Sequence, residues 1–476
     1  MPFNSVSPVL VKEIRQGLKS RSFAGSFVII QLLMMLCILL YLTSLRQRSD
    51  VSFVNGLFWF FLSVPLVMVL PLRGFQTIHE EVKNKTLELI FLTRLSAWQI
   101  VFGKWLALFV QGALIVVAVM PYLVLRYFLG GINLVEDLWA LGSLFLSFAI
   151  LLALGVGLSA IQSRVIRIVL IVGAVFSLYL IPVMMISWAF SGGGPRSTFM
   201  MMNAGTIAAV SIGLTLLLVV FLLEFGASLI APPAENHALR KRALGILLLA
   251  SIALLALLGP SSDIYALALL ALVPIGVDAL VESARFIPVL YRPSRFPPRW
   301  FLPSLMRMMR GLFYPGWPSG VLYVLALMAV TYGVGFFFMS SSEDMGSAFV
   351  AQLGALLFPL AAILLIRPNP SSHIVPYLVI QLSLVIFTFI MYVTFEATNM
   401  YSAEWIAVFP LSYLMMMVFD HDKVEGGFFL TFFVTAASVI ILLVRMRMPW
   451  TRMRVMEKMF SGGGVTKQDI PSATQS

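Results

Sequence analysis

The sequence predicts an all-α polytopic membrane protein with about 12 transmembrane helices (12–13), an N-terminal interfacial helix and a cytoplasmic coupling helix. Of its 476 residues, 60% are hydrophobic and only 11% are charged. The apolar residues recur in runs of about 20, a length that crosses a hydrocarbon core of ~30 Å. Because the runs lack the period-two alternation of a membrane β-barrel, each is expected to satisfy its own backbone groups as a helix.

Residues 1–23 predict an amphipathic helix that lies along the membrane interface. Ser7 is a good N-cap and Pro8 suits the first helical position. Three apolar residues then share one face of this helix, namely Leu10, Ile14 and Leu18. A plain positively charged flank of the first span is the alternative. The apolar run that follows lacks a small-residue cleavage site, so we expect an uncleaved anchor.

Residues 24–231 predict a first unit of six spans. The apolar runs cover residues 24–44, 55–73, 99–126, 138–160, 167–189 and 205–230. Lysine and arginine cluster in alternate loops, and the positive-inside rule assigns these loops to the cytoplasm. The basic stretch 232–242 is then a cytoplasmic linker. We therefore expect a multi-pass protein of the plasma (inner) membrane with both termini in the cytoplasm.

Residues 243–446 predict a second six-span unit. Its apolar runs cover residues 243–259, 264–281, 320–339, 347–366, 374–395 and 427–446. Residues 282–319 form its long cytoplasmic segment, and residues 447–476 form a cytoplasmic tail with a disordered end. The short stretch 405–419 is flanked by acidic loops, so a re-entrant or interfacial segment is favoured over a thirteenth span.

The distribution of charge and the few cysteine and histidine residues argue against several classes of function. The net charge is +11, but the cations lie beside the ends of apolar runs, where they face anionic lipid rather than nucleic acid. The single cysteine, Cys37, cannot form an intrachain disulfide. The four histidines lack a metal-ligand spacing, and no nucleophile signature marks a catalytic residue. We therefore expect no catalytic, cofactor or metal site in this chain.

The segment 77–98 carries charges between two spans and predicts a bent pair of helices. Thr77 and Glu80 have the spacing of a capping box, as do Ser96 and Gln99. Each hydroxyl would accept a hydrogen bond from a backbone amide at the start of a helix. We therefore expect one helix to begin at Thr77 and another at Ser96.

The first of these helices is amphipathic. Leu87, Ile90 and Phe91 form an apolar stripe opposite the charges. Leu95 and Ile100 flank the second cap as a hydrophobic staple, which would fix the angle of entry into the third span. A short amphipathic helix at the membrane surface is suited to docking in a groove of a partner protein.

The stretch EEVKNKTLELIFLTRLSAWQIVFGK, residues 80–104, resembles the segment E-x-x-x-G-T-L-E-x-L-x-x-x-P-L-S-x-x-x-I-x-x-G-K of ABC transporter permeases of the type-2 exporter class. The matching residues are Glu81, Thr86, Leu87, Glu88, Leu89, Leu95, Ser96, Ile100, Gly103 and Lys104. Lys85 stands where the family usually has Gly, and Arg94 where it usually has Pro. Residues 7–23 and 231–242 are also similar to family segments, so the resemblance covers roughly the first 240 residues.

The resemblance implies the membrane-spanning permease subunit of an ATP-driven exporter, which is not itself an enzyme. In that family the segment after the second span is a coupling helix that contacts a separate ABC ATP-binding subunit, which acts as a dimer. ATP and Mg²⁺ would then bind to that partner, and the sequence contains no phosphate-binding loop of its own. A second copy of the chain or a second permease, together with membrane lipid, completes the expected partners. The residues expected to couple to the ATP-binding subunit are Glu80, Glu81, Lys85, Thr86, Leu87, Glu88, Leu89, Leu95, Ser96, Gly103 and Lys104.

Two other functions remain open. An ion-coupled secondary transporter needs carboxylates within the membrane, and Glu224 in the sixth span is the best candidate. Buried pairing or snorkelling is the alternative role for Glu224, and Asp278 and Arg126 lie near span ends, where snorkelling is easy. A membrane scaffold or intramembrane enzyme without transport activity is the other possibility.

The motif GVGLSA, residues 155–160, imitates part of a dinucleotide-binding fingerprint. It falls within a predicted span and follows no strand. Small residues in that position favour close packing of two helices instead.

Overall fold

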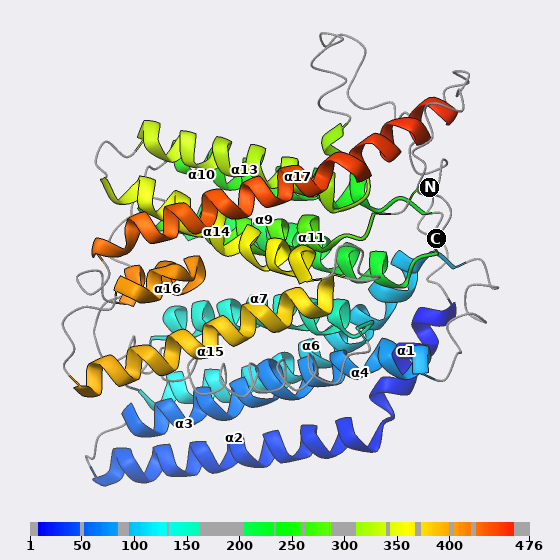
Figure 1. The fold of residues 1–476 in the computed structure, drawn as a ribbon. Coiled ribbons are helices and arrows are strands. Elements are labelled where there is room, and N and C mark those ends of the chain that lie inside the picture. The colour runs from blue at the N-terminus through cyan, green and yellow to red at the C-terminus, as the bar shows by residue number, and fades with distance from the viewer. Residues whose placement is uncertain are drawn as a thin grey trace. The chain divides into compact units, whose positions relative to one another are not determined.

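The computed structural model describes residues 8–47, 52–83, 95–130, 133–161, 204–232, 235–258, 262–284, 286, 311–338, 343–366, 373–398, 404–419 and 425–460. These residues form helices and contain no strand (Figure 1). Within them, nine helical stretches are long and apolar enough to cross a membrane. The protein is therefore an all-α polytopic membrane protein.

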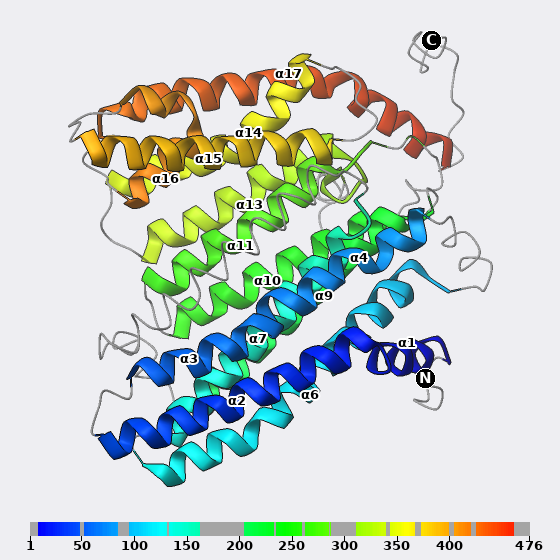
Figure 2. The ribbon, with the colours of Figure 1, turned by 90° about the horizontal axis from the view of Figure 1, so that it is seen from below.

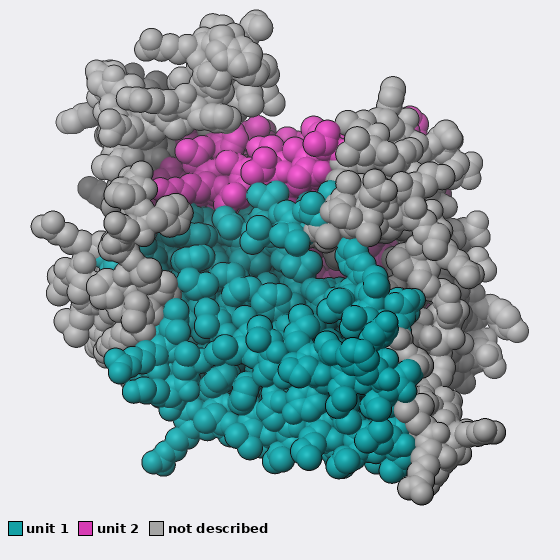
Figure 3. All heavy atoms as spheres, turned by 180° about the vertical axis from the view of Figure 1, so that it is seen from behind, with its two compact units in different colours: residues 1–231 teal, residues 232–476 magenta. Residues whose placement is uncertain are grey.

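The chain divides into two compact units. Unit 1 covers Met1–Ala231 and unit 2 covers Pro232–Ser476 (Figure 3). Each unit packs its own helices around its own buried side chains, so the two are described separately.

Unit 1 is built from antiparallel helices. Helix α7 lies at its centre and packs against α4, α6 and α9, while α1 packs against α6. Figure 2 shows α2, α3, α6 and α7 running side by side. The predicted span 167–189 lies outside the described residues. The elements of unit 1 are α1 (Pro8–Leu18), α2 (Arg21–Gln47), α3 (Ser52–Ser63), η1 (Val64–Val69), α4 (Leu70–Lys83), α6 (Ala97–Leu129), α7 (Leu134–Leu158) and α9 (Ala204–Ile230).

Helices α3 and α4 join through the π-helical turn η1 into one long helix. Pro65 has no backbone N–H, and the N–H of Leu70 donates to the carbonyl of Pro65, five residues back. The helix then continues to Lys83, about ten residues beyond the predicted span 55–73. The predicted helix start at Thr77 is therefore wrong. Thr77 lies within α4, and its hydroxyl donates to the carbonyl of Gly74 instead of capping.

The predicted cap at Ser96 is confirmed. The Ser96 hydroxyl accepts a hydrogen bond from the N–H of Gln99 (3.3 Å), and the Gln99 side chain accepts one from the N–H of Ser96 (3.0 Å). This reciprocal capping box sets the start of α6 at Ala97.

The GVGLSA motif lies at the contact between α7 and α9, as its small residues predict. A Cβ added to Gly157 would stand 2.7 Å from the carbonyl oxygen of Leu222, and Gly226 of α9 faces Gly157 directly. Glycine is required here because the two backbones approach too closely for a side chain.

Unit 2 is arranged around α14, which packs against α13, α16 and α17. Helices α10 and α11 form an antiparallel pair, and α11 packs against α13. The elements are α10 (Ala238–Leu258), α11 (Ser262–Val281), α13 (Trp317–Phe338), α14 (Glu343–Ile366), α15 (Ile374–Thr398), η4 (Glu404–Val408), α16 (Pro410–Phe419), η6 (Glu425–Gly427) and α17 (Phe428–Phe460).

The stretch 405–419 is helical but too short to span. Helix α16 has 10 residues, which rise about 15 Å, half the thickness of a hydrocarbon core. It is buried in protein together with η4, where Ile406, Tyr413 and Met416 form a core cluster. The structure therefore favours a segment that enters the protein without crossing the membrane.

Helices of unit 2 extend into two stretches that the sequence analysis placed outside the spans. Residues 238–242 of the predicted linker form the start of α10, and Lys241 and Arg242 are buried. The predicted tail from residue 447 begins as helix, because α17 continues to Phe460. Charge near a span end is consistent with a helix that continues, so composition shows where an apolar run ends but not where its helix ends.

Candidate functional site

The described chain buries charged side chains at the ends of its helices. Three groups stand out, and each is named after its basic residue. The Lys104 cluster and the Arg126 cluster lie in unit 1, and the Arg242 cluster lies in unit 2.

The Lys104 cluster joins three helices. Lys104 lies in the second turn of α6, and its Nζ is 2.7 Å from Glu81 Oε1 on α4 and 3.7 Å from Glu13 Oε1 on α1. Lys104 is buried, so these ion pairs are less screened than exposed ones. The cluster therefore connects the helix that precedes residues 84–94, the helix that follows them, and the N-terminal helix.

Neighbouring residues of the predicted coupling set have different environments. Glu80 is exposed on the last turn of α4, whereas Glu81 points inward to Lys104. A Cβ added to Gly103 would meet no atom of the described chain within 4 Å. Leu95 is partly buried and Ser96 is exposed at the start of α6. The remaining members lie outside the described residues: Lys85, Thr86, Leu87, Glu88 and Leu89.

Two members of that set contact each other within the described chain. Glu81 and Lys104 pair with each other inside unit 1, and their predicted contact with a partner subunit stays a prediction. The sequence motif places the two residues at opposite ends of the segment, and only the fold shows that the ends meet. Within the described chain their ion pair joins α4 to α6.

The Arg126 cluster lies at the opposite end of α6. Arg126 is 1% exposed, and its Nη1 lies 3.6 Å from Asp137 Oδ2 at the start of α7. Arg126 also donates to the side-chain carbonyl of Asn55, and its guanidinium lies 4.1 Å from the ring centroid of Phe58. The predicted snorkelling of Arg126 is wrong, because the cation is paired within the protein.

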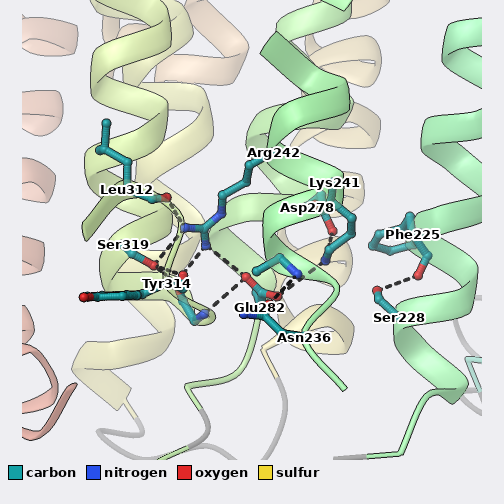
Figure 4. Close-up of polar contacts among 12 residues, drawn as sticks. Phe225, Ser228, Asn236, Lys241, Arg242, Asp278, Glu282, Leu312, Tyr314 and Ser319 are labelled. Carbon is teal, nitrogen blue, oxygen red and sulfur yellow. Dashed lines mark hydrogen bonds and ion pairs between the residues drawn. The ribbon is translucent and has the colours of Figure 1, made fainter. Parts of the chain in front are cut away.

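The Arg242 cluster binds the ends of α10, α11 and α13 together (Figure 4). Arg242 Nη2 is 2.9 Å from Glu282 Oε2, and Nη1 donates to the Ser319 hydroxyl at 2.9 Å. The guanidinium also donates to the carbonyls of Leu312 and Gly316. One arginine thus holds both sides of the stretch that separates α11 from α13.

A second basic residue completes this cluster. Lys241 Nζ lies 2.7 Å from Asp278 Oδ1 and 3.6 Å from Glu282 Oε1. Burial raises the pKa of the Glu282 carboxyl, but Lys241 and Arg242 more than offset this and hold the pKa below its ordinary value. Asp278 is buried and paired, so its predicted snorkelling is wrong.

Sequence analysis did not identify the Arg242 cluster as a site. Its one signal is that Lys241-Arg242 precedes an apolar run while Asp278 and Glu282 end the next one. Two antiparallel helices place such ends together. This spacing could have predicted the ion pairs once the linker was recognised as helical.

The two units share this arrangement. In each unit a carboxylate at or just after the end of the second long helix pairs with a buried cation, Glu81 with Lys104 and Glu282 with Arg242. The cation lies on the following long helix in unit 1 and on the preceding one in unit 2. Both pairs gather the helix ends on either side of a connecting segment.

Glu224, the predicted intramembrane carboxylate, is buried on α9. Its side chain is 4% exposed, within a helix that packs against α6 and α7. Its position confirms burial and leaves its role in transport a prediction.

The fold and these clusters define a polytopic helical membrane protein with buried ion pairs at the ends of its helices. Comparisons of the chain with protein-family models, with curated proteins and with solved structures found no match.

Proposed function

We propose that the chain is the membrane-spanning permease subunit of an ATP-driven ABC exporter. The observation that supports this proposal is the Lys104 cluster. It links α1, α4 and α6, and α4 and α6 flank the segment that resembles a coupling helix. In this proposal the Lys104 end of unit 1 faces the cytoplasm of a cell whose plasma (inner) membrane holds the protein. ATP and Mg²⁺ bind to a separate, dimeric ATP-binding subunit.

The cluster gives the proposed coupling a mechanical basis. A push by the partner on residues 84–94 reaches α4 directly through Lys83 and α6 through the cap at Ser96. Lys104 Nζ lies 2.7 Å from Glu81 Oε1. Because this ion pair joins α6 to α4, the two helices move together. Glu13 adds the N-terminal helix to the same moving part.

The test compares charge reversals in and away from the coupling segment. The tagged chain is purified from its native membrane, and vanadate-sensitive ATP hydrolysis is measured in the eluate. Glu88→Lys should abolish the copurifying hydrolysis, because it reverses a charge in the segment that resembles a coupling helix. Glu136→Lys is the matched control, since Glu136 is exposed in the first turn of α7, beside the Arg126 cluster.

Two results would contradict the proposal. One is a well-folded chain that brings no ATP hydrolysis with it. The other is a Glu88→Lys variant that retains the same hydrolysis as the wild type. An effect of Glu136→Lys equal to that of Glu88→Lys would show loss of folding rather than loss of docking.

A second candidate function rests on Glu224. Its burial on α9 is typical of a residue that binds a coupling ion in a secondary transporter. In that case Glu224→Gln would abolish transport by the purified chain in vesicles without any ATP. Transport that needs the ATP-binding subunit and survives Glu224→Gln would exclude this candidate.

A further inference from the structure

Helix α17 is longer than a membrane is thick. It has 33 residues, which rise about 50 Å, whereas a hydrocarbon core is ~30 Å across. Its last residues therefore extend beyond the hydrocarbon, and Figure 2 shows α17 continuing past the ends of α14 and α15. This extension carries five cations and one carboxylate, namely Arg445, Arg447, Arg452, Arg454, Lys458 and Glu457.

One face of the extension is packed against unit 2. Met453 is fully buried, and Phe286, Tyr314 and Trp450 pack around it. The Arg452 guanidinium lies 5.7 Å from the ring centroid of Phe286. The extension is thus held in place by protein.

Another face of α17 presents a stripe with a seven-residue spacing. Phe433, Ile440, Arg447 and Arg454 follow one another at intervals of nearly two helical turns, which in a regular helix keeps them within about 60° of one another, and Pro449 lies between the two arginines. Phe433 is 67% exposed and Ile440 is 61% exposed. Arg447 and Arg454 are also exposed. An apolar surface therefore leads directly to two cations.

We propose that this stripe, residues 433, 440, 447 and 454, binds an anionic phospholipid of the surrounding leaflet. An acyl chain would lie along Phe433 and Ile440, and the phosphate would lie between Arg447 and Arg454. Two guanidinium groups can donate several charge-assisted hydrogen bonds to one phosphate. Trp450, whose ring centroid lies 5.9 Å from the Arg454 guanidinium, supports that side chain at headgroup depth.

The order of residues along the stripe favours a lipid headgroup over a free phosphate. A free anion needs only the two arginines, whereas a phospholipid also uses the exposed apolar surface that precedes them. The matched charge on the other side of the helix is Arg445, which is exposed and about 160° away from Arg447. This inference does not depend on the proposed exporter function.

The experiment measures lipid binding to the full chain by native mass spectrometry in detergent micelles. Phosphatidylglycerol and phosphatidylcholine are added separately, and inorganic phosphate is the third ligand. We expect phosphatidylglycerol to bind more tightly than phosphatidylcholine. Arg447→Gln and Arg454→Gln should each weaken it about fivefold, in line with the electrostatic contribution of one basic residue near an anionic surface. Arg445→Gln should change the affinity less than twofold.

Three outcomes would overturn the site. An equal loss of affinity for phosphatidylglycerol in all three variants would show only that the lipid is attracted to the positive charge of the helix as a whole. Binding of inorganic phosphate at the same affinity as phosphatidylglycerol would show that the apolar stripe plays no part. Equal affinities for the two lipids would show that the arginines recognise no anionic headgroup. Circular dichroism of each variant tests whether α17 remains helical.

Discussion

Buried ion pairs join the helix ends of this protein, and substituting their residues costs more stability than substituting exposed charges. Lys104 compensates two carboxylates, Glu81 and Glu13, that lie on other helices. Removing one partner of a buried pair leaves an uncompensated charge, which costs more than the pair itself contributes.

The first prediction concerns Lys104. Lys104→Met should lower the free energy of unfolding by about 2 kcal/mol, because Glu81 and Glu13 lose the buried cation that Lys104 supplies. The measurement is equilibrium unfolding of the purified chain in mixed micelles. Lys104→Met combined with Glu81→Gln should recover at least half of the loss, since the double variant removes both the cation and the carboxylate nearest to it.

The neighbouring Glu80 provides the control. It is exposed on the same turn of α4, so Glu80→Gln should change the free energy of unfolding by less than about 0.5 kcal/mol. If the double variant lost as much as the sum of the losses in Lys104→Met and in Glu81→Gln alone, Lys104 and Glu81 would not be coupled.

At this scale the sequence predicted local contacts but not distant ones. The Ser96 cap forms between residues three apart, so its spacing alone identifies it. Glu81 and Lys104 meet only because α4 and α6 are antiparallel and adjacent. The same holds for Arg242 and Glu282, which are 40 positions apart. Pairing at that distance depends on packing that no local pattern reports.

Helix packing in unit 1 depends on small residues where two backbones meet. Helices α7 and α9 approach each other at Gly157 and Gly226. Close approach improves van der Waals contact between membrane helices, where lipid gives no hydrophobic driving force for association.

The second prediction tests that contact. A Cβ at position 157 would lie 2.7 Å from the Leu222 carbonyl oxygen, so Gly157→Ala must push α9 away. We expect a loss of about 1–3 kcal/mol in the free energy of unfolding, the usual cost of overpacking. Thermal unfolding followed by circular dichroism measures it.

Gly142 on the same helix is the matched control. A Cβ there would meet nothing within 4 Å. Gly142→Ala should therefore be neutral or stabilising by about 0.5 kcal/mol, because alanine favours a helix more than glycine does. Equal losses at positions 142 and 157 would argue against a specific α7–α9 contact.

Hydropathy predicted the helices well but some of their ends poorly. Apolar runs located α2, α6, α7 and α14 to within a few residues. The end of α4 was missed because a polar, charged stretch after Gly74 continues the same helix as an extension beyond the apolar run. Capping residues inside a helix look like caps in the sequence, as Thr77 does, and only hydrogen bonding distinguishes them.

The whole molecule consists of two compact units with separate buried ion clusters. Lys104 and Arg126 stabilise unit 1, and Arg242 stabilises unit 2. The third prediction is that each unit unfolds as its own cooperative transition. A destabilising substitution in one unit should then leave the other transition in place.

Thiol labelling during denaturant titration measures this. Cys37 is 2% exposed in α2 and is the sole cysteine of the chain, so it reports on unit 1. A Cys37→Ser, Ala351→Cys variant reports on unit 2, because Ala351 is fully buried in α14. Lys104→Met should move labelling of Cys37 to a lower denaturant concentration and leave position 351 unchanged. Arg242→Gln should move labelling of position 351 to a lower denaturant concentration and leave Cys37 unchanged. If either substitution advanced labelling at both positions, the chain would unfold as one unit.

Helix α6 carries a paired cation near each of its ends, and this sets a length. Lys104 and Arg126 lie 22 positions apart, a rise of about 33 Å, close to the thickness of a hydrocarbon core. Neither cation can shift relative to the neighbouring helices of unit 1 without breaking its ion pair. The distance between the two cations therefore sets the thickness of hydrocarbon that unit 1 matches best. In a thinner membrane unit 1 would tilt or the bilayer would thicken locally around α6. In a thicker membrane the bilayer would thin locally.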